Sequence, residues 1–308
     1  MSDPVVRPVP LVPQRRFAGV RFGEWRSPRR GHGDEVAGAR PYRPGDRRAW
    51  IDWRASARLQ AARSADEFVV REFFADQAPR VVLVVDRRPR MDLYAAPFPW
   101  LDKPAAVDGV IRLVVASTAA ERGDVGYVEH VAGRTRWLAP RGPSDLAAVL
   151  ARRPDRNTFD SGPASLEASL AELGRHASVL PTGTFVFVVS DFVDAVGATA
   201  WGRLRAHHWD VTPVVVQDPT WEQSFPDVGS VLLPVLDPAS GRVDEVWLRP
   251  GEARARAQAN ERRRNDLCAS LRRFGFDPIL LDSSDVREIA SAFGRWAERR
   301  LRMRRRSA

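Results

Sequence analysis

The stretch RVVLVVD, residues 80–86, decides the fold of this chain. Its five consecutive apolar residues, 81–85, predict a strand that is buried on both faces, as strands of parallel sheets are. The pattern returns over 184–190, where it is again followed by an aspartate, Asp191, and a third apolar strand is expected over 211–216. The chain therefore repeats the kind of strand from which a parallel sheet is built.

Helical patterns separate these strands. Residues 104–121 place apolar side chains at helical spacing, and Pro104 suits a first turn. Alternating strands and helices predict a doubly wound α/β fold with a mostly parallel, Rossmann-like sheet. We expect further helices over 145–151, 165–175, around Trp201 and over 286–301, and shorter strands over 125–131, 135–138 and 278–281.

The chain is predicted to have four parts. Residues 1–22, rich in proline and arginine, predict an extended arm that does not pack, and residues 23–78 predict a β-rich leader. Residues 79–298 hold the α/β domain. Within it, residues 218–250 break the alternation and predict a β-hairpin insertion, which extends the sheet or packs on the leader. Residues 299–308 form a basic tail.

The positive charge lies at the two ends. The chain has a net charge of +9, of which residues 1–30 supply +5 and residues 299–308 supply +6, so that −2 is left for residues 31–298. Basic ends of this kind bind nucleic acid or anionic membranes weakly, or serve as solvated, solubilising tails. We favour solvated tails and keep weak nucleic-acid binding through the basic ends as an alternative.

Composition excludes several classes of protein. The sequence contains no run of about 18 apolar residues, so no membrane helix is expected. It has no apolar segment near its start, so no secretory signal is expected either. A cytoplasmic location is therefore expected. The single cysteine, Cys268, excludes an intrachain disulfide and a multi-cysteine zinc site. Lys103 is the only lysine and follows no glycine-rich loop, which excludes a P-loop nucleotide hydrolase.

Two aspartates mark the candidate site. Asp86 and Asp191 each follow a buried strand, and ligands of open parallel sheets bind where strands end and their order reverses. Two converging carboxylates suit a hard cation such as magnesium. The alternative is that each aspartate caps the next helix or binds loop amides.

The first part of the chain carries a series of short motifs. They read Gly31-x-Gly33-x-Glu35, Arg40-x-Tyr42-x-Pro44-Gly45-Asp46, Ile51-Asp52-Trp53 and Ser56-Ala57-Arg58. In these residues and spacings the chain resembles the domain-of-unknown-function 58 family, and the resemblance extends from about residue 23 to residue 300. We expect mainly structural roles for the signature, with direct partner contact as the alternative. Gly45 would permit a tight turn, Tyr42, Trp50 and Trp53 would pack the leader onto the sheet, and Arg40, Asp46, Asp52 and Arg58 would form ion pairs.

The resemblance implies a fold and a partner. The family is similar to von Willebrand factor A domains, and its genes commonly neighbour those of MoxR-type AAA+ ATPases, so its members look like adaptors or assembly factors. In von Willebrand factor A domains, a D-x-S-x-S loop, a threonine and a later aspartate hold a metal ion, which takes a partner's carboxylate. The family's usual two N-terminal membrane helices are missing from this sequence, which argues against membrane attachment.

This chain departs from the pattern of that metal site. Arg88 and Arg90 stand where the loop has its two serines, and Ala164 stands near the expected threonine, with Thr158 and Ser161 nearby. Ala49 stands where the signature usually has arginine, and we expect Arg48 to serve in its place. Two guanidiniums beside carboxylates repel a divalent cation and neutralise Asp86 themselves. We therefore expect no cofactor and no metal, with magnesium as the alternative.

The sequence thus predicts a non-catalytic protein-interaction module that partners a MoxR-type AAA+ ATPase and a client protein. Its site would be a degenerate metal-binding rim, and a partner's acidic side chain would meet the arginines directly. The enzymatic alternative is a metal-dependent binding protein or hydrolase that uses Asp86 and Asp191. The site residues predicted for the rim are Asp86, Arg88, Arg90 and Asp191.

Overall fold

The computed structural model describes residues 7–14, 36–42, 48–63, 68–73, 78–95, 100–152 and 158–306. The chain divides into two compact units. One consists of residues 1–15 and 79–308, and the other of residues 16–78. The predicted boundary between leader and α/β domain, 78/79, coincides with the boundary between the units.

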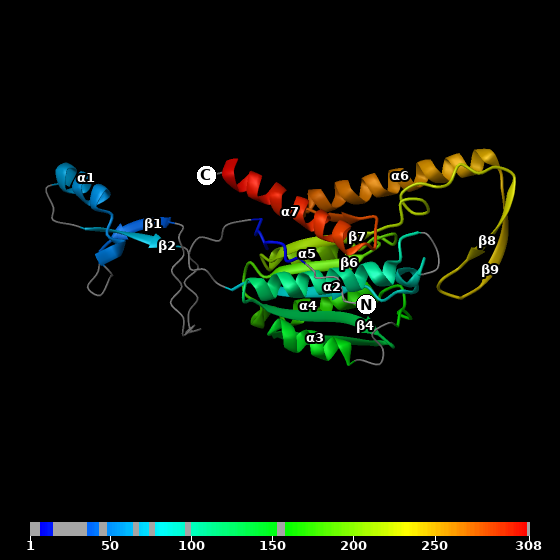
Figure 1. The fold of residues 1–308 in the computed structure, drawn as a ribbon, viewed down its shortest axis with the longest axis horizontal. Coiled ribbons are helices and arrows are strands. Elements are labelled where there is room, and N and C mark those ends of the chain that lie inside the picture. Colours follow the sequence, from blue (N-terminus) through cyan, green and yellow to red (C-terminus); the bar gives the residue numbers. More distant parts are fainter. Residues whose placement is uncertain are drawn as a thin grey trace. The chain divides into compact units, whose positions relative to one another are not determined.

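The larger unit is built on a six-stranded sheet (Figure 1). The strands lie in the order β10-β7-β6-β3-β4-β5, and all neighbours are parallel except β4 and β5. This arrangement confirms the predicted doubly wound, mostly parallel sheet. The bounds are β3 (Arg80–Val85), β4 (Asp124–Val131), β5 (Arg134–Arg141), β6 (Phe185–Ser190), β7 (Asp210–Val216) and β10 (Ile279–Leu281).

Helices cover both faces of this sheet, because the central strands are apolar on both sides. On one face, Leu83 and its alternate neighbours pack against α2 (Lys103–Ala120), α3 (Pro143–Ala151) and α7 (Val286–Arg306). On the other face, Val82 and Val84 pack with α4 (Ser165–Arg175), α5 (Ala198–Ala206) and α6 (Pro250–Arg273). Within the described residues, no helix is both long enough and apolar enough to cross a membrane.

The strand order creates a switch point between β3 and β6. From β3 the chain moves outward to β4 and β5 on one side, then returns to β6 on the other side and continues outward to β7 and β10. The loops after β3 and β6 therefore leave the sheet in opposite directions, the arrangement at which ligands of such folds bind. Asp86 and Asp191 come directly after these two strands and so lie at this switch point.

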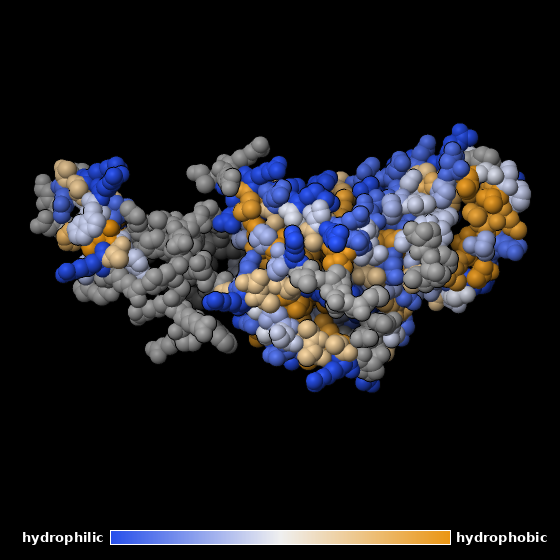
Figure 2. All heavy atoms as spheres, in the orientation of Figure 1, coloured by the Kyte–Doolittle hydropathy of each residue, from blue (hydrophilic) through white to orange (hydrophobic). Residues whose placement is uncertain are grey.

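The insertion is a hairpin, as predicted. Strands β8 (Val231–Leu236) and β9 (Val243–Leu248) pair antiparallel in a sheet of their own, so they do not extend the six-stranded sheet. The hairpin lies apart from that sheet, beside the N-terminal end of α6 (Figure 1). Figure 2 shows hydrophobic residues gathered on it. The exposed ones are Leu232, Val235, Leu236, Val243, Val246 and Trp247.

The smaller unit is less β-rich than the sequence predicts. Strands β1 (Val36–Pro41) and β2 (Val69–Phe73) pair antiparallel, but residues Trp53–Arg63 form helix α1, which was not predicted. The helix was missed because its residues WRASARLQAAR carry no apolar face of helical period.

The signature residues that the structure describes support the backbone of this unit. Ile51 pairs with Val70 of β2, and Asp52 donates its backbone N–H to the Val69 carbonyl and caps α1 through the amide of Ala55. Tyr42 and Trp53 both contact the ring of Phe68 edge to face, and the Arg40 guanidinium donates to the Pro41 carbonyl. Ala57 and Arg58 lie on the exposed surface of α1, whereas Pro44, Gly45 and Asp46 lie outside the described residues.

The prediction that the N-terminal arm does not pack was wrong for the part of it that the structure describes, residues 7–14. This segment is extended, but Val9, Leu11 and Val12 are buried in the core beside α2 and α7. Its backbone amides also find side-chain acceptors, since Val9 donates to Ser117 Oγ at 2.9 Å. A single strand-like segment with few apolar residues gives no periodic signal, so only its tertiary contacts show that it packs.

The prediction of a solvated basic tail also needs correction. Residues 299–306 continue helix α7, and Arg300 is only 1% exposed. Its guanidinium donates to Asp210 at 2.9 Å, to Thr212 Oγ1 at 3.0 Å and to the Val12 carbonyl at 3.0 Å. One of the six arginines of this segment therefore holds the N-terminal arm and the start of β7 together.

Candidate functional site

All four residues predicted for the rim meet beyond the carboxyl ends of β3 and β6. Asp86 follows β3, Arg88 precedes the short helix η2 (Pro89–Asp92), Arg90 lies within it, and Asp191 follows β6. Asp86 and Asp191 are each at most 1% exposed. The two aspartates therefore converge here, and both are buried.

The first cluster is centred on Arg88. Its Nε lies 3.0 and 2.9 Å from the two oxygens of Asp86, and its Nη2 lies 2.7 Å from Asp86 Oδ2. Ser190 also donates to Asp86 Oδ2 at 2.7 Å, and Arg88 Nη1 lies 3.0 Å from Asp194. Burial lowers the pKa of Arg88, but the hydrogen bonds and charge of Asp86 raise it above its usual value, so the guanidinium stays charged.

The second cluster contains Lys103 and Glu222, which were not among the predicted site residues. Lys103 Nζ lies 3.1 Å from Asp191 Oδ2, 2.6 Å from Glu222 Oε1 and 3.1 Å from the Arg90 carbonyl oxygen. Lys103 begins α2 and is fully buried, while Glu222 follows β7. Lys103 is the only lysine among the 48 lysine and arginine residues of the chain, and this was the sequence signal that singled it out.

The two carboxyl groups that share Lys103 shift in opposite directions. Burial acts to raise the pKa of Asp191, but the charges of Lys103 and Arg90 and the amide of Val193 hold it below its usual value. Burial raises the pKa of Glu222 above its usual value, against the opposing charge of Lys103, and the nearby charge of Asp191 raises it further. Of these two carboxyl groups, Asp191 is thus the one whose surroundings favour the charged form.

The loop after β7 is held by backbone contacts. Asp218 accepts from the amides of Leu101, Thr220 and Trp221, at 2.9, 2.9 and 2.8 Å. It therefore shapes the loop that delivers Glu222 and does not face the cations. The residues near the expected threonine act in the same structural way. Ser161 donates its hydroxyl to the His130 carbonyl and its amide to the Arg87 carbonyl, and Ala164 is the N-cap residue directly before α4.

A third buried group closes the rim on the β4 side. Arg87 donates from Nε to Glu129 at 3.0 Å and from Nη2 to Tyr127 Oη at 3.0 Å, and Tyr127 donates to Glu129 at 2.8 Å. Arg136 also reaches Glu129, at 3.3 Å. The ends of four neighbouring strands are therefore tied together by ion pairs and hydrogen bonds.

These residues do not fit a divalent metal ion. Magnesium needs several free oxygen ligands, yet both oxygens of Asp86 are taken by Arg88, and Asp191 Oδ2 is taken by Lys103. A metal ion would also meet the fixed positive charges of Arg88 and Lys103 at short range. Among the described residues, no group of three or more His, Cys, Asp or Glu side chains is arranged to hold a metal.

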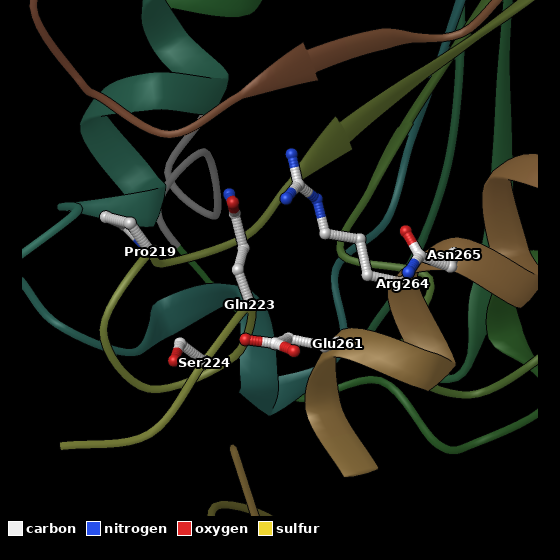
Figure 3. Close-up of a pocket in the computed structure, with 6 residues that line it drawn as sticks. All are labelled: Pro219, Gln223, Ser224, Glu261, Arg264 and Asn265. Carbon is white, nitrogen blue, oxygen red and sulfur yellow. The ribbon is translucent and has the colours of Figure 1, made fainter. Parts of the chain in front are cut away.

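A polar pocket of about 360 Å³ lies beside the loop that carries Glu222 (Figure 3). Three of its lining residues come from this loop, Pro219, Gln223 and Ser224, and three from α6, Glu261, Arg264 and Asn265. The loop is fastened to the same helix, because Arg263 donates to the Glu222 carbonyl at 2.9 Å and Asn260 to the Trp221 carbonyl at 3.2 Å. The pocket is thus polar, and its loop is fixed to the helix that supplies its other wall.

Known proteins resemble this chain over most of its length. "Uncharacterized protein Rv1480" of Mycobacterium tuberculosis and "Uncharacterized protein Mb1516" of Mycobacterium bovis are each 26% identical to it over 272 residues, which are 88% of this chain and 81% of theirs. Among solved structures, the conserved hypothetical protein BatB from Bacteroides thetaiotaomicron aligns over 71% of this chain and 99% of its own, with 16% identity and a TM-score of 0.43. An aerotolerance-related membrane protein from Bacteroides fragilis aligns over 70% and 99%, with 15% identity and a TM-score of 0.42.

The family assignment rests on a match over most of the chain. The model of the family described as "Protein of unknown function DUF58" matches residues 38–266. The match is narrower than the span of about 23–300 that the motifs suggested, but it includes the signature from Arg40 to Arg58 and the loops after β3, β6 and β7. With its signature, its doubly wound sheet and this match together, the chain belongs to the DUF58 family.

Proposed function

We propose that this protein is a non-catalytic interaction module and that partner proteins dock on the rim between β3 and β6. The observation that carries the proposal is the pairing of the rim's charges. Asp86, Asp191 and Glu129 are buried and each is bound to a fixed cation, so these carboxylates are engaged inside the protein and are not placed to exchange a proton with a bound substrate. What such a rim offers to another molecule is a rigid, charged surface.

The exposed charged side chains of the rim, Arg90 and Asp194, are the ones that a partner would contact. Arg90 is 34% exposed at its side chain, and its Nε lies 3.5 Å from Asp191 without a hydrogen bond. Asp194 is 55% exposed and rests on Nη1 of Arg88. A partner's carboxylate can pair with the exposed part of Arg90, whereas Arg88 is buried and stays bound to Asp86 and Asp194. Charges presented in this way give specificity and a fast association rate more than affinity.

We further propose that the partner is a MoxR-type AAA+ ATPase acting on a client complex, with the cytoplasm as the site of action. Support comes from family membership together with the resemblance between the family and von Willebrand factor A domains. The metal-dependent alternative is disfavoured by the pairing of Asp86 with Arg88. The nucleic-acid alternative is weakened because Arg300 is buried and bound to Asp210.

Affinity purification from the native host, at low salt with ATP present, tests this proposal. We expect an AAA+ ATPase to co-purify with the wild-type chain and to be reduced at least tenfold by Arg90→Glu. The matched control is Arg205→Glu, which changes an exposed arginine in the last turn of α5. Because α5 leads into the start of β7, this residue lies at the amino ends of the strands, away from the rim. No ATPase with the wild-type chain, or equal recovery with Arg90→Glu, contradicts the proposal.

A further inference from the structure

We propose that Lys103 is a built-in cation, which permanently fills an oxygen-lined cation site at the rim and leaves the site without an exchangeable ion. The inference concerns the charge of the site and holds whether or not the ATPase is the partner. It predicts that neither divalent metals nor chelators change the thermal stability of the protein.

The surroundings of Lys103 Nζ are those of a cation site. Its three protons face three oxygens, from Asp191 at 3.1 Å, Glu222 at 2.6 Å and the Arg90 carbonyl at 3.1 Å. Carboxylate and carbonyl oxygens are the donors that a hard cation takes. Three acceptors also satisfy the hydrogen-bonding capacity of an ammonium group in full.

An aromatic wall completes the cage. The ring of Tyr94 lies 5.7 Å from Lys103 Nζ, at cation–π range, and is itself braced edge to face by Trp100. Burial and the charges of Glu222 and Asp218 raise the pKa of Tyr94, so its hydroxyl stays neutral. Two carboxylates, a carbonyl and an aromatic face together form a receptor for a small ammonium ion.

The position of Lys103 argues that the charge itself is required. It lies in the first turn of α2, where the helix dipole disfavours a cation, and it is fully buried. A buried lysine is stable there only because the carboxylates compensate for the lost hydration. The other 47 basic residues are arginines, and the planar guanidinium does not match a compact three-oxygen cage as an ammonium does.

Arg88 completes the charge balance. Three buried carboxylates, those of Asp86, Asp191 and Glu222, face Lys103, Arg88 and the partly exposed Arg90. Each of these three carboxylates therefore already has a cation of the chain beside it, and a divalent cation could enter only by displacing one of these side chains.

Thermal unfolding of the full chain in different salts tests the inference. Variant Lys103→Ala empties the cage, while Lys103→Met fills it with an uncharged chain of similar length. We expect both to unfold at lower temperature than wild type. Methylammonium chloride at about 0.1 M should raise the Tm of Lys103→Ala by roughly 3 °C or more, while tetramethylammonium, which is too large, should not. Lys103→Met should respond to neither salt. If Lys103→Ala must be refolded from denaturant, its refolding yield should be higher in methylammonium chloride than in the tetramethylammonium salt.

The wild-type chain provides an independent readout. Its Tm should not change with EDTA, and titration calorimetry should detect no Mn²⁺ binding tighter than about 1 mM. Mn²⁺ binding that Asp191→Asn abolishes would overturn the inference, because it would reveal an exchangeable metal. A folded Lys103→Ala variant that no small ammonium stabilises would overturn it as well. None of these measurements uses a partner protein, so failure to recover an ATPase and failure of this inference are distinguishable.

Discussion

The ammonium nitrogen of Lys103 lies 3.1 Å from Oδ2 of Asp191, although 88 residues separate the two in the sequence. The contact joins the start of α2 to the end of β6, across the point where the strand order reverses. It places a fixed positive charge where open α/β sheets bind their ligands. Both the docking proposal and the built-in cation proposal depend on this relationship.

Removing the charge of Asp191 should strongly destabilise the larger unit. Asp191→Asn leaves Lys103 buried with one carboxylate fewer, and breaking a buried ion pair from one side costs roughly 3 to 5 kcal/mol. Urea unfolding followed by circular dichroism measures the loss. Asp194→Asn is the control, because this carboxylate is half exposed and its loss should cost about 1 kcal/mol or less. Equal stabilities of the two variants would contradict this account of the site.

The stability of the wild-type chain should fall in acid partly through Asp191. Its pKa is lowered in the folded state, so its contribution is present above the unfolded value of 3.8 and is lost as the pH falls through the folded pKa. The difference in unfolding free energy between wild type and Asp191→Asn should therefore shrink below about pH 4. A difference that stays constant from pH 6 to pH 2.5 would show that this carboxyl has an ordinary pKa.

Glu222 should show the opposite sign. Its pKa is raised in the folded state, so its contribution to stability is present below the unfolded value of 4.5 and is lost as the pH rises through the folded pKa. Glu222→Gln resembles the protonated form. The variant should therefore gain stability relative to wild type as the pH rises above 4.5, and unfolding curves at pH 4, 6 and 8 measure the trend. A relative loss over that range would contradict the direction of the shift.

Arg300 should behave as a core residue and not as part of a solvated tail. Arg300→Met removes a buried guanidinium that binds Asp210, Thr212 and Val12, and should cost roughly 3 kcal/mol or more. Arg302→Met, two residues further on the same helix, alters a side chain that is 79% exposed and should change stability by about 0.5 kcal/mol or less. Denaturant unfolding of both variants checks the contrast, and similar losses would refute it.

The N-terminal segment should contribute to the stability of the larger unit. Leu11 is buried in its core, so Leu11→Ala should cost roughly 2 to 3 kcal/mol, whereas Pro10→Ala, on the exposed side of the same segment, should cost much less. Thermal unfolding compares the two. A chain that lacks residues 1–14 and unfolds at the wild-type temperature would show that the segment is dispensable.

Much of the fold could be predicted from local pattern. The apolar runs before Asp86 and Asp191 give buried parallel strands, and the helical spacing over 104–121 gives α2, because these signals reside in neighbouring residues. Helix α1 and the packed segment 7–14 were missed, since neither carries a periodic apolar pattern. The convergence of Asp86, Arg88, Arg90 and Asp191 was predicted because residues that follow adjacent parallel strands must meet at one edge of the sheet.

By itself, the sequence determined the sheet, the signature of the family and the presence of arginines where metal-binding serines would stand. Only the tertiary structure decided which cation pairs with which carboxylate, because Lys103, Asp191 and Glu222 belong to three separate segments whose contact depends on strand order and helix position. It also decided that Arg300 is buried, since an arginine in a basic run becomes a core residue only when a distant carboxylate, here that of Asp210, compensates for its lost hydration.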